Sequence, residues 1–173
     1  MSSTAPVSTV RARPGKYLIF RLAEEAYGID IFSVREIIGL PAITPVPRTP
    51  VFIKGVINLR GKIIPVVDLR TKFCMSQKEF TRDTCIVMVD VAATSGRLWM
   101  GIIVDSVRDV ANFAAGDLEE VPSFGVRVDT SFLLGLGRQK EGMTLLLDIE
   151  KVLSHEELIA VKSSTEPSEG AAN

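Results

Sequence analysis

The 173-residue chain contains an internal repeat. YGIDIFSVREII at 27–38 aligns with MGIIVDSVRDVA at 100–111, and the shared Ser-Val-Arg-acidic core makes the match specific. FIKGVINLRGKIIPVVDL at 52–69 then aligns without a gap with FLLGLGRQKEGMTLLLDI at 132–149. Because the blocks follow in the same order in both halves, the repeat predicts that the halves fold as two similar units.

Each half contains several short β-rich runs separated by loops. The apolar runs YLIFRL at 17–22 and CIVMVDV at 85–91 precede the first repeated block in the two halves. Spacings of roughly 8 to 12 residues between such runs are typical of small barrels or sandwiches. The sequence therefore predicts a mainly β fold with two small barrels, at approximately 17–80 and 81–150.

Helices are expected to be few. Ser154 and Glu157 have the spacing of a capping box, which predicts a last helix from about residue 155 to 161. Four prolines between residues 39 and 50 exclude a helix there and favour an extended strand that pairs weakly or at an edge. That strand is either a docking edge or a stiff connection between strands.

The ends of the chain read as disordered tails, at 1–14 and 163–173, because both are small, polar and poor in large apolar residues. The folded part is therefore expected to span about 15–162. The N-terminus lacks an apolar core of signal-peptide length, and no stretch approaches the roughly 20 apolar residues of a bilayer span. Cys74 and Cys85 form no CxxC pair, so we expect a reduced cytosolic protein.

The charge pattern argues against a nucleic-acid partner. The chain has 20 Lys and Arg against 21 Asp and Glu, and the basic residues do not cluster. A protein that neutralises many phosphates needs a concentrated basic patch, so nucleic acid is excluded as a partner class.

The sequence offers little for catalysis. Its only histidine, His155, stands in the capping box, where an exposed residue is the simpler interpretation. Ser33 and Ser106 lack a nearby base or a nucleophile motif, and Asp68 and Asp148 read as two separate caps better than as paired carboxylates. No phosphate-binding glycine loop and no metal site is visible. We therefore predict no catalytic residue, no metal and no cofactor.

At YGIDIFSVREI, followed by TPVFIKGVINLRGKIIPVVDLR, the chain closely resembles the CheW family of bacterial chemotaxis coupling proteins. The similarity continues through GIIVDSVRDV, FLLGLG and LLLDIEKVL and covers roughly residues 16 to 160. It implies two five-stranded β-barrels of the SH3 or OB type, with exchanged segments, a shared apolar core and a short terminal helix. It also implies a non-enzymatic cytoplasmic adaptor.

The resemblance implies two protein partners. One is the cytoplasmic tip of a methyl-accepting chemoreceptor, and the other is the regulatory domain of a CheA-like histidine kinase. Such an adaptor reaches the inner face of the membrane only indirectly, through receptor clusters. The alternative is a paralogue of CheW, or a detached kinase regulatory domain, serving a different chemosensory-type pathway.

The resemblance also assigns candidate contacts. The candidate receptor contacts are Val34, Glu36, Gly55 and Arg60, with Val104 and Val107 as a possible second wall. The candidate kinase contacts are Ile38, Ile43, Thr44 and Val46, with Phe124 on the second barrel. Ordinary barrel core is the alternative for Val104 and Val107.

Arg60 and Glu36 carry opposite charges. Our hypothesis is that Arg60 is held by a carboxylate, either that of Glu36 or one on a partner, and so fixes register at the rim of an apolar site. The alternative is that Arg60 is an exposed turn residue. For Trp99, the only tryptophan, packing is favoured over a partner contact.

Overall fold

The computed structural model of the protein describes residues 11–76, 79–93, 96–122, 130–140, 142–154, 157 and 161. Strands dominate these residues, and none of their helices is long and apolar enough to cross a membrane. The strands are β1 (Gly15–Leu22), β2 (Glu25–Asp30), β3 (Val34–Gly39), β4 (Ile53–Leu59), β5 (Lys62–Asp68), β6 (Cys85–Ala93), β7 (Gly96–Val104), β8 (Ser106–Phe113), β9 (Leu118–Glu119), β10 (Leu133–Gln139) and β11 (Gly142–Leu147). The helical elements are α1 (Leu69–Lys72) and the 3-10 turns η1 (Ile31–Ser33) and η2 (Ala115–Asp117).

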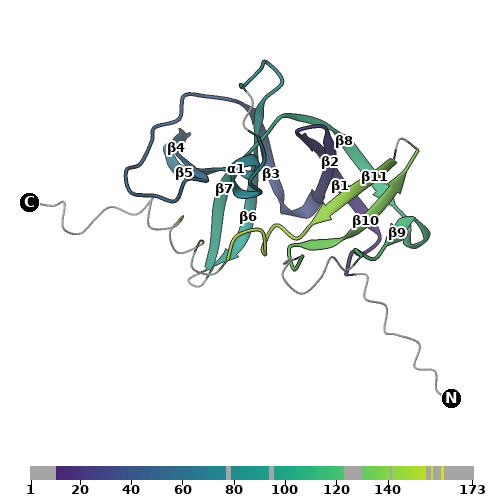
Figure 1. The fold of residues 1–173 in the computed structure, drawn as a ribbon. Helices are drawn as coiled ribbons and strands as arrows, with labels where there is room; N and C mark the ends of the chain where they lie inside the picture. Colours follow the sequence, from purple (N-terminus) through teal and green to yellow (C-terminus); the bar gives the residue numbers. More distant parts are fainter. Residues whose placement is uncertain are drawn as a thin grey trace, which may run out of the picture.

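The strands form two sheets that lie side by side (Figure 1). Sheet A has the order β8-β1-β2-β11-β10-β9, and sheet B has the order β3-β6-β7-β5-β4. Each sheet therefore combines the first hairpin of one repeat half with the remaining strands of the other half. The parallel pairs β11 with β2 and β5 with β7 join the exchanged pieces. The expected two-unit β fold with exchanged segments is confirmed.

In each sheet, the segment that follows one edge strand pairs with the strand at the opposite edge. In sheet B, the segment after β3 reaches β4 through one bridge between Thr44 and Val56. In sheet A, the chain after β8 reaches β10 through the two-residue strand β9, which brings that sheet to six strands instead of five. Proline has no N–H to donate to a ladder, so the proline-rich segment makes a single bridge where a full strand would otherwise close the ring.

The repeat detected in the sequence is visible in the details of the hairpins. β4 and β10 have the same alternation of buried and half-buried residues, and in both the pairing register shifts at the second residue, Lys54 in β4 and Leu134 in β10. The amide of Asp68 donates to the Phe52 carbonyl at 2.8 Å, and that of Asp148 donates to the Phe132 carbonyl, also at 2.8 Å. The matched segments thus share backbone geometry as well as residue types.

Apolar side chains gather in three clusters. The largest, which we call the shared core, lies between the sheets and takes residues from β1, β2, β6 and β7. A second cluster fills sheet B around Ile57, Ile64 and Ile103, and a third fills sheet A around Ile19 and Phe113. Two β units that each have their own interior and also share a core should behave as one stiff body.

The ends of the described chain contact the fold. Arg11 and Ala12, which we expected in the N-terminal tail, both donate backbone hydrogen bonds to the Leu134 carbonyl, and Ala12 is buried. The predicted capping box is present, because Ser154 and Glu157 exchange side-chain to backbone hydrogen bonds. Glu157 and Val161 have helical backbone conformation, while the other residues of the predicted last helix lie outside the described part. Asp148 was expected to cap a helix, but its carboxylate caps a turn.

Candidate interaction surfaces

Arg60 lies at the tip of the hairpin between β4 and β5. The Asn58 side chain accepts a hydrogen bond from the Gly61 amide at 2.8 Å, which closes the turn and directs Arg60 outward. The Arg60 guanidinium binds Glu36 on β3 with both nitrogens, Nη2 to Oε1 at 2.6 Å and Nη1 to Oε2 at 3.1 Å. Of the two carboxylates that we considered for Arg60, the structure places that of Glu36 on it. The Arg60 side chain remains 66% exposed, so one face of the guanidinium is open to a partner.

The pair is held by charge-assisted hydrogen bonds. The hydrogen bond from Arg60 lowers the pKa of Glu36, and the same contact raises the pKa of Arg60. A bidentate guanidinium–carboxylate contact also fixes the plane of both groups. The pair therefore joins β3 to the β4–β5 hairpin at the outer edges of sheet B.

This geometry predicts the pH dependence of the pair. We expect the Glu36 carboxyl to titrate below its ordinary value of 4.5, and the Arg60→Ala substitution to return its pKa toward that value. Because the pKa is lowered in the folded state, any stabilisation from the pair is complete above pH 4.5 and is lost as the pH falls through the lowered pKa. A carbon-detected NMR titration of the Glu36 carboxyl in both proteins measures this. An identical midpoint with and without the guanidinium would contradict the prediction.

The candidate kinase contacts lie on β3 and on the segment that crosses to β4. Thr44 and Val56 exchange two backbone hydrogen bonds, each at 2.9 Å, which hold the crossing segment against β4. Gly55 is buried beneath it, so this candidate receptor contact packs directly against Ile43 and Thr44.

The side chains of this segment differ in accessibility. Ile38 and Ile43 are half-buried against the interior of sheet B, whereas Thr44 is exposed. Val46 is half-buried, and its carbonyl accepts from the Thr49 hydroxyl at 2.8 Å. Phe124 lies outside the described residues.

The three candidate receptor valines belong to the shared core or pack against it. Val34 and Val107 are half-buried and pack against it, so each presents part of its surface outward. Val104 has no exposed surface and belongs to the core itself. Of the two alternatives for Val104, a groove wall or ordinary barrel core, its burial favours the core.

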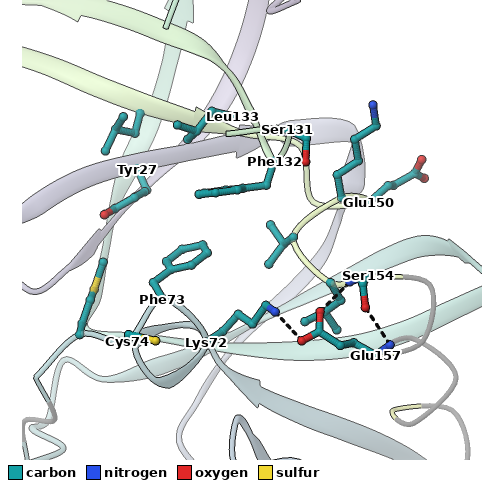
Figure 2. Close-up of a pocket in the computed structure, with 15 residues that line it drawn as sticks. Tyr27, Lys72, Phe73, Cys74, Ser131, Phe132, Leu133, Glu150, Ser154 and Glu157 are labelled. Carbon is teal, nitrogen blue, oxygen red and sulfur yellow. Dashed lines mark hydrogen bonds and ion pairs between the residues drawn. The ribbon is translucent and has the colours of Figure 1, made fainter. Parts of the chain in front are cut away.

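A cavity of about 900 Å³ opens between the two sheets, away from the candidate contacts. Figure 2 shows the stacked rings of Phe73 and Phe132 in its wall, with centroids 5.1 Å apart, and the Tyr27 ring also stacks on Phe73, with centroids 6.2 Å apart. The Lys72 ammonium binds the Glu157 carboxylate at the rim. Sequence reasoning missed this cavity because its wall comes from four distant segments.

Two groups of charged residues were also missed. Arg70 on α1 is 2% exposed and is held by the Asp68 and Asp105 carboxylates, with Arg70 Nη1 3.0 Å from Asp105 Oδ1. Asp90 on β6 is buried and accepts from Arg35 at 2.6 Å and from Arg97 at 2.9 Å. Burial acts to raise the pKa of Asp90, but the two arginines outweigh it and the pKa is lowered. No group of side chains in the described ranges could hold a metal ion.

Comparison with known proteins places the chain among chemotaxis proteins. A family model described as CheW-like domain matches residues 16–157. The chain is 43% identical over 146 residues to a protein named chemotaxis protein CheW from Klebsiella aerogenes, which covers 84% of this chain and 86% of that one. The Rhizobium meliloti protein of the same name is 33% identical over 144 residues, covering 83% and 90%. The crystal structure of the scaffolding protein TtCheW from Thermoanaerobacter tengcongensis superposes with a TM-score of 0.72 at 35% identity, covering 84% of this chain and 97% of that one.

Proposed function

The chain belongs to the CheW family, and from this premise we propose that it is a non-enzymatic adaptor coupling a chemoreceptor to a CheA-like histidine kinase in the cytoplasm. The receptor partner is the helical cytoplasmic tip of a methyl-accepting chemoreceptor. The kinase partner is the regulatory domain. The membrane is reached only through the receptor.

The observation that carries the proposal is the Arg60–Glu36 pair and its surroundings. Arg60 is held from one side and open on the other, while Ile37 and Ile63, close to the two members of the pair along the chain, are 44% and 46% exposed. An amphipathic helix is recognised by apolar contacts with a polar border, and a fixed guanidinium supplies such a border. Half-buried Val34 and Val107 add apolar surface at the junction of the sheets.

Coupling by an adaptor needs no reaction of its own. Receptor state alters kinase activity only if the two occupied sites favour different joint arrangements, a coupling typically worth about 1 to 3 kcal/mol. A stiff pair of β units transmits such a preference, whereas a flexible linker would lose it. Weak individual contacts suffice when an array supplies many of them together.

The decisive experiment reconstitutes the three components. The purified chain is mixed with the chemotaxis kinase and with receptor-bearing membranes, and kinase autophosphorylation is measured. We expect phosphorylation to respond to the receptor only when all three are present. A kinase that responds equally well without the chain would refute the adaptor role, and a response only with the kinase of another chemosensory-type pathway would favour the paralogue.

Arg60 gives a sharper prediction for the receptor. The Arg60→Ala substitution should weaken co-sedimentation with receptor-bearing membranes about tenfold, since removing a charge-assisted hydrogen bond at the rim of a site costs about 1.4 kcal/mol. Arg60→Lys should rescue only part of the loss, because lysine cannot reproduce the planar fork. Arg138→Ala is the matched control, because Arg138 is also an exposed arginine, at 56% against 66% for Arg60, and binds Glu119 in sheet A. Full binding by a folded Arg60→Ala protein would remove Arg60 from the site.

A further inference from the structure

The segments that follow β5 and β11 begin with the same aspartate-to-amide hydrogen bond but carry opposite charges. After β5, the amide of Arg70 donates to the Asp68 carboxylate at 2.9 Å. After β11, the amide of Glu150 donates to the Asp148 carboxylate at 3.1 Å. Extending the gapless alignment of 52–69 with 132–149 by one residue pairs Arg70 with Glu150. The repeat therefore places an arginine after β5 and a glutamate after β11.

Arg70 reaches the tip of a hairpin in the other sheet through Asp105. One oxygen of the Asp105 carboxylate accepts from Arg70 Nη1 at 3.0 Å, and the other accepts from the Ala23 amide at 2.7 Å. Ala23 lies in the turn between β1 and β2 of sheet A, whereas Arg70 lies on α1 directly after sheet B. The side chains of Arg70 and Asp105 are 3% and 20% exposed. We call these contacts the buried clamp.

Glu150 makes the equivalent connection from the end of sheet A to a hairpin of sheet B. Its carboxylate accepts from the Ala92 amide at 3.2 Å and from Arg97 Nη1 at 3.4 Å, both on the β6–β7 hairpin of sheet B. Glu150 itself follows β11 of sheet A. Arg97 also binds Asp90 at 2.9 Å, so the contact is anchored in sheet B. The side chains of Arg97 and Glu150 are 56% and 46% exposed, and we call these contacts the exposed clamp.

We propose that Arg70 and Glu150 are positioning residues whose two clamps fix the orientation of one sheet relative to the other. The shared core packs the two sheets into one body, and because apolar burial is not directional, the charged contacts add a preference for one angle between the sheets. The charged hydrogen bonds of the two clamps are directional, so they favour one angle between the sheets. This inference rests on the proposed adaptor function: the clamps are needed to couple the partners and not to bind either one.

The exposed clamp can be tested without losing the fold, because an exposed ion pair contributes only about 0 to 1 kcal/mol. Spin labels are attached at Ala42→Cys near sheet B and Asn112→Cys on β8 of sheet A, in a chain carrying Cys74→Ser and Cys85→Ser. Pulsed electron resonance then gives the distribution of distances between the sheets. We expect Glu150→Ala to broaden it, and Glu24→Ala, which removes an exposed carboxylate in the β1–β2 turn, to leave it unchanged. Glu150→Gln is the second variant, and it should broaden the distribution less.

The coupling assay separates positioning from binding. Glu150→Ala should bind the kinase alone and the receptor membranes alone as the unmodified chain does, yet give less receptor-dependent phosphorylation. An unbroadened distribution would overturn the clamp, as would a matching loss of binding to either partner. If the adaptor proposal is wrong but the clamp proposal is right, the unmodified chain gives no receptor-dependent phosphorylation. The distance distribution still broadens in Glu150→Ala.

Discussion

Replacing Arg70 with alanine should lower the free energy of unfolding by about 3 to 5 kcal/mol, the usual cost of removing one partner from a buried ion pair. Arg70 and Asp68 are both buried, and Asp105 is mostly buried. Without the guanidinium, these carboxylates lose their cation while the surrounding structure still excludes water. The loss should exceed that of any single exposed ion pair in the protein.

Urea unfolding followed by circular dichroism measures this loss, with the slope of the transition checked for two-state behaviour. Arg138→Ala is the control, since Arg138 and Glu119 are 56% and 42% exposed and their separation should cost about 0 to 1 kcal/mol. Equal losses in the two variants would mean that Arg70 is not held as the structure places it. Arg70→Met separates lost packing from lost charge. Methionine has a similar length and restores the packing, but it still leaves the two carboxylates without a cation.

The sequence predicted the two-unit β fold because two matching sequence blocks indicate two units of similar structure. The alignment of 52–69 with 132–149 survives in three dimensions as matching bulges and matching hydrogen bonds at Asp68 and Asp148. The exchange of strands between units came from the family resemblance and not from spacing. A repeat shows which pieces are alike, but it does not show which hairpin pairs with which half.

The candidate contacts were predictable where charge and turn chemistry act locally. The resemblance named Arg60 and Glu36 as candidates, and their opposite charges predicted the ion pair that the structure contains. The sequence left Val104 open between groove wall and core, because an apolar residue in a strand looks the same whether it faces a partner or a core. Exposure separates the two cases, and it depends on strands that are distant in sequence.

Arg70 was overlooked for a related reason. An arginine directly after the run IIPVVDL reads as the exposed end of a strand. Its partner Asp105 is 35 residues away, in a turn between sheets, so no local pattern links them. The repeat did hold a signal, because Arg70 and Glu150 occupy equivalent positions with opposite charge, and such a reversal inside a repeat identifies residues that face different surroundings.

Gly55 is the second position where one substitution should have a large effect. Its φ of +144° is one that side chains rarely adopt, and an added Cβ would overlap the Thr44 carbonyl oxygen and lie 2.9 Å from Ile43 Cγ2. Because the oxygen belongs to the backbone, the clash is relieved only if the crossing segment moves off β4. We therefore expect Gly55→Ala to cost about 2 to 4 kcal/mol and to break the bridge between Thr44 and Val56.

Hydrogen exchange at the Thr44 and Val56 amides reports the bridge directly, because each donates to the carbonyl of the other residue. In Gly55→Ala both amides should lose protection, and kinase binding should fall with them if the crossing segment is the kinase contact. Gly39→Ala on β3 is the control, since a Cβ there meets no atom within 4 Å, and its stability should change by less than about 0.5 kcal/mol. Retained protection at both amides in Gly55→Ala would show that the segment accommodates a side chain, whereas reduced protection with intact kinase binding would separate the bridge from the kinase contact.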